Sequence, residues 1–174
     1  SEFISAAEDS GMITDLGRLV LGEAIARIPY LPGDQMMSVN ASASQLESAG
    51  FAAGILEQPR SCGANPEQLV VEITEHSLLN LEKSARTDLL SLTNAGVGIY
   101  VDDFGTGYSS LERLLSLPID AIKLDYSFTQ TLLKGDERLV KAVLLLGREL
   151  DMPVIAEGVE TEEMRMQLYQ LGCH

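Results

Sequence analysis

The segment Val97-Gly-Ile-Tyr-Val-Asp-Asp-Phe-Gly-Thr-Gly107 decides the fold class of this chain. It begins as a short apolar run and ends in two adjacent aspartates and a glycine-rich turn. An apolar run without polar alternation is typical of a strand with both faces buried, as in a parallel sheet covered by helices. We therefore predict a strand over Val97–Val101 that carries Asp102 and Asp103 at its carboxyl end.

Similar units of an apolar run and a helical pattern extend from this segment in both directions. The other predicted strands are Met36–Asn40, Leu69–Ile73, Ala121–Leu124 and Pro153–Ala156. The predicted helices are Ile13–Ile28, Ser42–Glu57 ended by Pro59, Ala85–Asn94 capped by Gly96, Ser109–Ser116, Glu137–Leu150, and one that starts at its cap Thr161 and reaches Leu171. Alternating strands and helices predict an α/β fold with parallel strands and right-handed crossovers. Because no low-complexity linker divides the chain, residues 1–174 are predicted to form one domain.

Each predicted strand delivers a polar side chain to its carboxyl end. These side chains are spaced 21 to 34 residues apart, about one strand–helix unit, and are Asn40, Glu72, Asp102 with Asp103, Lys123 and Glu157. In a parallel α/β barrel the active site lies at that end of the strands. We therefore expect these groups to form one site.

The oxygen donors in this set favour Mg²⁺ or Mn²⁺ over zinc, because carboxylate and amide oxygens are hard ligands. Two adjacent aspartates can each serve one of two neighbouring ions, as in two-metal phosphoryl transfer. Glu157 could bind metal or accept a proton from water, and Lys123 could contact a phosphate oxygen or the attacking water. Any single acidic residue here could instead be a helix cap or a solvated turn. Lys123 within a buried strand requires a partner.

Composition limits the function classes. The chain has 12 basic and 26 acidic residues and a net charge of −14, which argues against a non-specific nucleic-acid binder. No apolar run approaches the ~20 residues of a membrane span. Cys62 and Cys173 form no metal or disulfide pattern, so the cytoplasm is the expected compartment.

The loop Gly105-Thr106-Gly107 precedes a predicted helix and is a candidate phosphate cradle. Glu75 is either a carboxylate at a helix start or a brace for that loop. A different reading of the same residues is an enolase-like barrel, with Lys123 as the base and the carboxylates on Mg²⁺.

The run Asp102-Asp-Phe-Gly-Thr-Gly-Tyr-Ser-Ser-Leu111 resembles the EAL domain, the bacterial cyclic-di-GMP phosphodiesterase family. Four further motifs carry the resemblance along the chain in the order expected: Ser38-Val-Asn40, Glu72-Ile-Thr-Glu75, Ile122-Lys-Leu-Asp125 and Ala156-Glu-Gly-Val-Glu160. The resemblance implies a modified TIM-type (β/α)8 barrel that uses Mg²⁺ or Mn²⁺ to hydrolyse cyclic-di-GMP to linear pGpG. A catalytically inactive cyclic-di-GMP receptor of the same fold is the alternative.

The resemblance also implies roles for individual residues. The implied metal ligands are Asn40, Glu72, Asp102 and Asp103. Lys123 would orient or activate the water, and Glu157 would be a metal ligand or general base. Glu75 would hold the 102–111 loop, which takes part in dimerisation in this family, and Asp125 and Glu160 would be secondary site residues. The resemblance is compatible with flanking sensor or diguanylate-cyclase domains and with a membrane anchor in the parent protein.

The chain departs from the family pattern at several places. The Glu-Ala-Leu motif is expected before Ser1 and a glutamine-containing motif after His174, so the barrel is expected to be incomplete at both ends and residues 1–174 alone to be inactive. Ala41, Ser44 and Tyr126 stand where the pattern has leucine, arginine and arginine.

Overall fold

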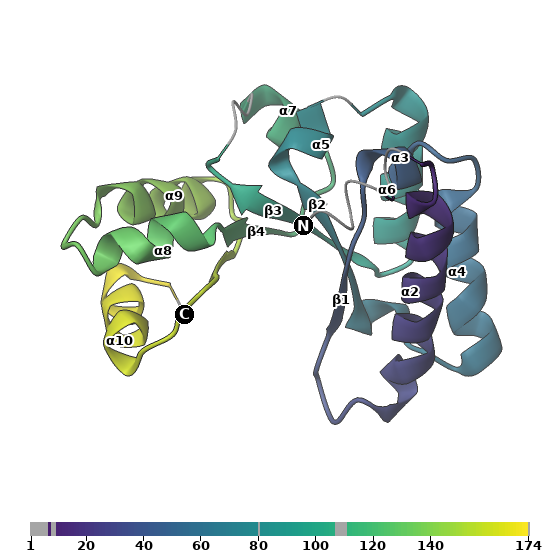
Figure 1. Cartoon of the computed structure of the whole chain (residues 1–174), viewed down its shortest axis with the longest axis horizontal. Helices are drawn as coiled ribbons and strands as arrows, with labels where there is room; N and C mark the ends of the chain where they lie inside the picture. The colour runs from purple at the N-terminus through teal and green to yellow at the C-terminus, as the bar shows by residue number, and fades with distance from the viewer. Residues whose placement is uncertain (1–6, 8–9, 80, 107–110, 174) are drawn as a thin grey trace. The chain divides into compact units, whose positions relative to one another are not determined.

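The computed structural model describes residues 7, 10–79, 81–106 and 111–173 (Figure 1). The chain divides into two compact units, Ser1–Ile73 with Asn80–Ile99 and Thr74–Leu79 with Tyr100–His174. The prediction of a single domain stays a prediction.

The first unit packs helices against a parallel pair of strands. Its elements are α2 (Ile13–Arg27), η1 (Ile28–Tyr30), β1 (Met37–Asn40), α3 (Ala43–Leu46), α4 (Phe51–Cys62), η2 (Pro66–Gln68), β2 (Leu69–Thr74, of which Thr74 belongs to the other unit) and α6 (Lys83–Asn94). Strand β1 pairs with β2 from Met37 opposite Leu69 to Asn40 opposite Glu72. Helix α2 lies beside α4 and β1, and α4 contacts α6 (Figure 1). Buried Ile25 and Ile55 belong to the core of this unit.

The predicted helix Ser42–Glu57 is wrong as a single helix. Ser42 forms a capping box with Gln45 that starts the short helix α3, and a turn with Gly50 at φ +82° separates α3 from α4. Pro59 also does not end α4, which continues to Cys62. A proline inside a helix removes its own N–H bond and its ring crowds the carbonyl four residues earlier. It disfavours the helix, but a final turn can still extend past it.

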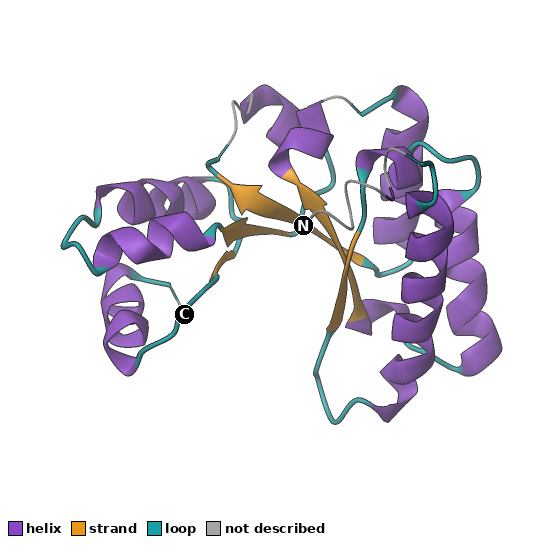
Figure 2. Cartoon of the chain, in the orientation of Figure 1, coloured by secondary structure: helices purple, strands orange, loops and turns teal. Residues whose placement is uncertain are grey.

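The second unit is a parallel sheet with helices packed on it (Figure 2). Its elements are α5 (Glu75–Leu79), β3 (Gly98–Phe104, of which Gly98 and Ile99 belong to the other unit), α7 (Leu111–Leu115), β4 (Ala121–Leu124), α8 (Tyr126–Leu132), α9 (Arg138–Glu149), β5 (Val154–Ala156) and α10 (Glu162–Leu171). Strand β4 pairs in parallel with β3 and with β5. All four residues of β4 are buried, as predicted for a central parallel strand.

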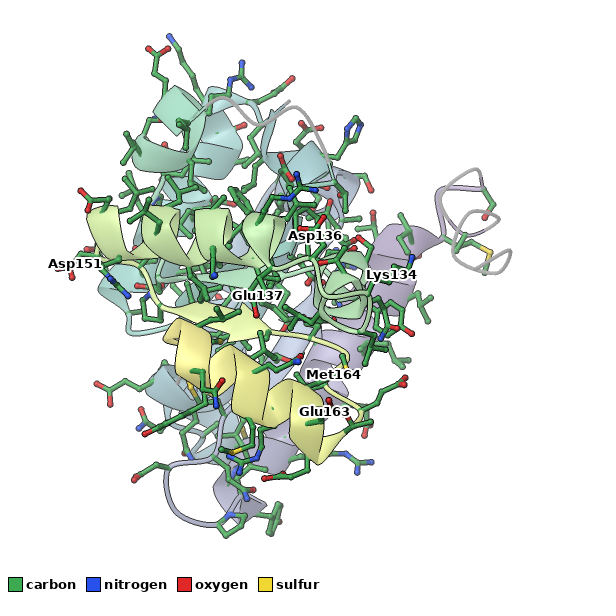
Figure 3. All side chains as sticks on the ribbon, turned by 90° about the vertical axis from the view of Figure 1, so that its left-hand side faces the viewer. Lys134, Asp136, Glu137, Asp151, Glu163 and Met164 are labelled. Atoms are coloured by element: carbon green, nitrogen blue, oxygen red, sulfur yellow. The ribbon has the colours of Figure 1, made fainter. Side chains whose placement is uncertain are left out.

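Local chemistry explains where these helices begin and end. The side chain of Thr161 accepts a hydrogen bond from the Met164 N–H at the start of α10, which confirms the predicted cap. Figure 3 labels Met164 on this helix. Gly96 follows α6 with φ +94°, which confirms the predicted helix end. The helix predicted over Ser109–Ser116 is found at Leu111–Leu115, and residues 109 and 110 lie outside the described ranges. The short helices α5 and α8 were not predicted.

Within the described ranges, no helix has the length and apolar composition that crossing a bilayer requires. Cys62 and Cys173 are not joined in a disulfide, and the Cys173 Sγ lies 3.4 Å from the Val154 carbonyl.

Candidate metal centre

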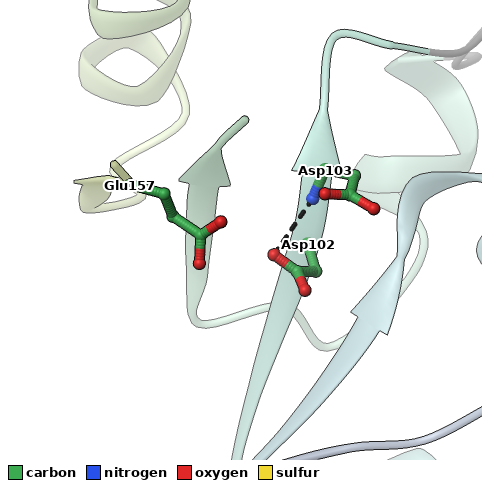
Figure 4. Close-up of side chains that lie close together, drawn as sticks. All are labelled: Asp102, Asp103 and Glu157. Atoms are coloured by element: carbon green, nitrogen blue, oxygen red, sulfur yellow. Dashed lines mark hydrogen bonds between the residues drawn. The ribbon is translucent and has the colours of Figure 1, made fainter. Parts of the chain in front are cut away.

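A bulge at the end of β3 positions Asp102 and Asp103. The pairing of β3 with β4 shifts register between Val101 and Phe104, and Asp103 has φ +53°. In a regular strand two successive side chains point to opposite faces. The bulge breaks that alternation, and the Asp103 N–H donates to Oδ1 of Asp102 at 3.1 Å (Figure 4). Thr106 stabilises the turn, because its N–H and its hydroxyl both donate to the Asp103 carbonyl at 3.3 and 2.8 Å.

Three carboxylates converge in the second unit. One carboxylate oxygen from each of Asp102, Asp103 and Glu157 lies within 4.8 Å of the other two (Figure 4). Asp102 and Asp103 lie near the carboxyl end of β3, and Glu157 directly follows β5. Three hard oxygen donors form a set that suits Mg²⁺ or Mn²⁺. The donor chemistry therefore fits the predicted metal. The donors come from residues far apart in the sequence.

Lys123 is the cation of this cluster. Its Nζ lies 3.1 Å from Oδ1 of Asp102 and 2.5 Å from Oε1 of Glu157. The sequence predicted that a lysine in a buried strand requires a partner, and Lys123 has two. The ammonium therefore links the end of β3 to the residue after β5 through β4.

Negative charge is in excess around Asp103. Burial raises the pKa of the Asp103 carboxyl, and the charges of Asp102, Asp125 and Glu157 raise it further, while Lys123 acts in the opposite direction. A divalent cation near Asp103 would offset this repulsion, because it favours the ionised carboxylate.

Asp125 and Glu160 differ in their local roles. Asp125 caps α8, since its Oδ1 accepts hydrogen bonds from the N–H, at 2.9 Å, and from the hydroxyl of Ser127. The same carboxylate contributes to the field at Asp103. Glu160 is exposed between β5 and α10. The secondary roles expected for the two residues stay predictions.

Glu75 contacts the glycine-rich loop. This residue is only 2% exposed, and its Oε2 accepts a hydrogen bond from the Gly105 N–H at 2.7 Å. Gly105 has φ +98°, and a Cβ there would collide with the ring of Phe128. The contact is of the kind that a loop brace requires, and the role stays a prediction. Gly105 and Thr106 are exposed, while Gly107 lies outside the described residues.

The first unit carries the other two candidate ligands. Asn40 and Glu72 are partners in the register of β1 and β2, so they lie side by side at the carboxyl ends of these strands. The Ala41 N–H donates to the Glu72 carbonyl at 2.8 Å, which extends the pairing by one residue. That these two residues share one centre with the cluster of the second unit stays a prediction.

Thr129 was not predicted as a site residue. It is fully buried on α8, and its hydroxyl lies 2.8 Å from the carbonyl of Glu157. Its partner lies 28 residues away in the sequence. No local pattern signals such a contact.

Comparison with known sequences identifies relatives along the whole chain. The family model described as the EAL domain matches residues 1–174. An uncharacterized signaling protein of Caulobacter vibrioides is 41% identical over 99% of this chain and 22% of its own length. MucR of Pseudomonas aeruginosa, named a bifunctional diguanylate cyclase/cyclic di-GMP phosphodiesterase, is 37% identical over 99% of this chain and 26% of its own length. The chain thus spans about a quarter of the length of these relatives.

Solved structures agree with the sequence comparison. The structure named PaMucR phosphodiesterase, c-di-GMP complex, superposes with a TM-score of 0.91 at 36% identity, over 99% of this chain and 72% of that one. This similarity confirms the predicted fold class, a TIM-type α/β barrel. Five strands of such a barrel lie in the described residues.

Proposed function

The chain belongs to the EAL domain family, and on that premise we propose that it is a metal-dependent phosphodiesterase that hydrolyses cyclic-di-GMP to linear pGpG. The observation that carries the proposal is the cluster of Asp102, Asp103 and Glu157 around the ammonium of Lys123. Relatives named cyclic di-GMP phosphodiesterases support the substrate.

The acidic residues would hold the metal. Asp102, Asp103 and Glu157 of the second unit, with Asn40 and Glu72 of the first, are the proposed ligands for Mg²⁺ or Mn²⁺ at a two-metal centre. When bound, such cations supply Lewis-acid charge for a phosphodiester and for the water that attacks it. Asp102 and Asp103 would act through the cations that they hold. Negative charge builds up on the phosphate in the transition state, so loss of either carboxylate would weaken mainly the stabilisation of that state.

Lys123 would orient the attacking water, and Glu157 is the candidate acceptor of its proton. The Lys123 ammonium fixes the carboxylates of Asp102 and Glu157 and can donate a hydrogen bond to the attacking water or to a phosphate oxygen. As the alternative to binding metal, Glu157 would accept the proton that the water loses as the new bond to phosphorus forms. The bond from phosphorus to the 3′ oxygen breaks, and that oxygen takes up a proton to give the free hydroxyl of pGpG. The backbone of Gly105, Thr106 and Gly107 would contact the phosphate.

The setting of the reaction is also part of the proposal. We place the chain in a cytoplasmic signalling protein with sensor or diguanylate-cyclase domains, acting as a homodimer. The name of the bifunctional relative and the fraction of its length that this chain spans support the additional domains. Membrane anchorage of the parent protein is compatible with the proposal.

A hydrolysis assay tests the function. The complete natural protein is incubated with cyclic-di-GMP and Mg²⁺, Mn²⁺ or a chelator, and pGpG is followed by chromatography. We expect pGpG with either metal and none with the chelator, and residues 1–174 alone should form none. Asp103→Asn should lower turnover at least ~100-fold, since it removes an anionic ligand of the cation that would stabilise the transition state.

Asp151→Asn is the matched control, because Asp151 is an exposed aspartate that also has a positive φ, +58°. It should keep full turnover. If the protein binds the nucleotide but forms no pGpG, it is a receptor and not an enzyme. Near-normal turnover in Asp103→Asn would contradict the two-metal assignment.

A further inference from the structure

A buried hydroxyl connects α8 to the segment that carries Glu157. Thr129 is 0% exposed, and its Oγ1 lies 2.8 Å from the carbonyl of Tyr126 and 2.8 Å from that of Glu157. The first contact stays within the helix, whereas the second spans 28 residues of sequence. A hydroxyl has one proton and two carbonyl acceptors here, so it can shift between them or share the proton.

Two further contacts hold the same segment. The Glu157 N–H donates to the Leu124 carbonyl at 3.2 Å, at the end of β4. Gly158 has φ +64°, and its Cα lies so close to the ring of Tyr126 that a Cβ would collide with the ring. The backbone of Glu157 is therefore held at its N–H by β4, at its carbonyl by Thr129, and at the next residue by Tyr126.

This backbone determines where the Glu157 carboxylate lies. The side chain is 34% exposed, and its Oε1 reaches Lys123 at 2.5 Å. A carboxylate at the edge of the cluster depends on its backbone anchor, because its own side chain is only partly enclosed. A displacement of about 1 Å in an active site can cost ~100-fold in rate.

We propose that Thr129 is a positioning residue that fixes the carbonyl of Glu157 through its hydroxyl and so keeps the Glu157 carboxylate at Lys123 and the aspartates. For catalysis, this inference rests on the proposed function, since it assigns Glu157 a part in that reaction. For the structure, it requires only that the hydroxyl orders the Glu157–Gly158 backbone.

Thr131 on the same helix offers a matched control. Its hydroxyl also lies near two backbone carbonyls, those of Phe128 at 2.6 Å and of Asp136 at 2.8 Å. It therefore makes the same kind of paired contact, directed to the loop after α8 instead of to Glu157. Thr→Val at either position replaces the hydroxyl with a methyl group, so it keeps the branched shape of the side chain and removes its hydrogen bonds.

The experiment compares three variants of the complete protein: Thr129→Val, Thr129→Ser and Thr131→Val. Thr129→Val should lower kcat about 10-fold and leave KM within about two-fold, because the positioned group acts on the reaction step. Thr129→Ser retains the hydroxyl, so its kcat should stay within about two-fold of wild type. The kcat of Thr131→Val should also stay within about two-fold of wild type. Hydrogen exchange of the Glu157 and Gly158 amides should be about five-fold faster in Thr129→Val, the change expected for one lost hydrogen bond, and unchanged in Thr131→Val.

The two readouts separate the inference from the function. If wild type forms no pGpG, the proposed function fails, and amide exchange alone decides the structural part of the inference. Exchange at Glu157 and Gly158 that is equal in Thr129→Val and wild type overturns the positioning role. If wild type is active and kcat is the same in Thr129→Val and Thr131→Val, the role is also overturned while the function stands.

Discussion

Nζ of Lys123 lies 3.1 Å from Oδ1 of Asp102, and each residue is only 9% exposed. Charges with little solvent around them interact more strongly than exposed charges, and each carries a desolvation cost that its partner must offset. The same ammonium also contacts Glu157. Lys123 therefore counters the repulsion among the carboxylates when no metal is bound.

Lys123→Met should destabilise the metal-free protein. The substitution leaves Asp102 and Glu157 without their shared cation, so we expect the free energy of unfolding to fall by about 3 kcal/mol, the scale for breaking a buried ion pair. Urea denaturation with a chelator present measures the change. Lys134→Met is the control, since Lys134 is exposed after α8 (Figure 3), and it should change stability by less than ~0.5 kcal/mol. An equal, small effect of both substitutions would show that Lys123 does not hold the cluster.

Strands β2 and β4 were predictable because both of their faces are buried. The predicted strand Ala121–Leu124 is β4 as found, and all of its residues are buried. The short helices were missed for a physical reason, since five residues in α5 and seven in α8 are too few for a helical period to stand out. Asp125 followed by Ser127 could have indicated α8, because an aspartate cap commonly precedes a helix.

The site was predictable in its residue types but not in its geometry. A strand end with two aspartates predicted oxygen ligands, yet regular alternation would have placed their side chains on opposite faces. The bulge at Asp103 depends on the register between β3 and β4, which pairs residues distant in sequence. The contact from Thr129 to Glu157 depends on tertiary packing in the same way.

Asp103→Asn should stabilise the metal-free protein at neutral pH. Burial and the neighbouring carboxylates raise the pKa of Asp103 in the folded state above its ordinary value of 3.8. The folded state therefore holds its proton where the unfolded state has lost it, and stability falls as the pH rises from about 3.8 through the raised pKa. Asparagine carries no such charge and tolerates a positive φ.

Thermal unfolding with a chelator at pH 3 and pH 7 checks this expectation. The difference in melting temperature, Asp103→Asn minus wild type, should be positive at pH 7 and larger there than at pH 3. Asp151→Asn should show no such change with pH. If Asp103→Asn lowers the melting temperature equally at both pH values, the repulsion is not a source of instability in the cluster.

Asp136 should contribute stability that disappears in acid. Its carboxylate accepts hydrogen bonds from the Arg138 side chain at 2.9 and 2.8 Å just before α9 (Figure 3). These bonds to Arg138 lower the pKa of Asp136 to about 2. A lowered pKa means that the contribution is complete above about 3.8 and is lost as the pH falls toward 2.

NMR titration of the Asp136 carboxyl measures this pKa directly. Arg138→Ala should return it toward 3.8. Arg165→Ala removes a comparable surface pair with Glu162 and should leave the pKa of Asp136 unchanged. A pKa that stays near 2 without Arg138 would show that another group lowers it.

Gly158→Ala should reduce both stability and turnover, and Tyr126 should account for part of the effect. Gly158 has φ +64°, so an alanine there would cost about 1–2 kcal/mol in backbone strain. Its Cβ would also collide with the Tyr126 ring, which must move away.

Removal of the Tyr126 ring by Tyr126→Ala relieves the collision with the Cβ of Gly158→Ala, but not the backbone strain. Gly158→Ala should therefore lower the free energy of unfolding by about 1 kcal/mol less in the Tyr126→Ala background. Substitutions of residues in contact do not have additive effects. Urea denaturation of the wild type, the two single variants and the double variant measures this coupling. Fully additive effects would mean that the ring does not press on Gly158 and that α8 positions the Glu157 segment through Thr129 alone.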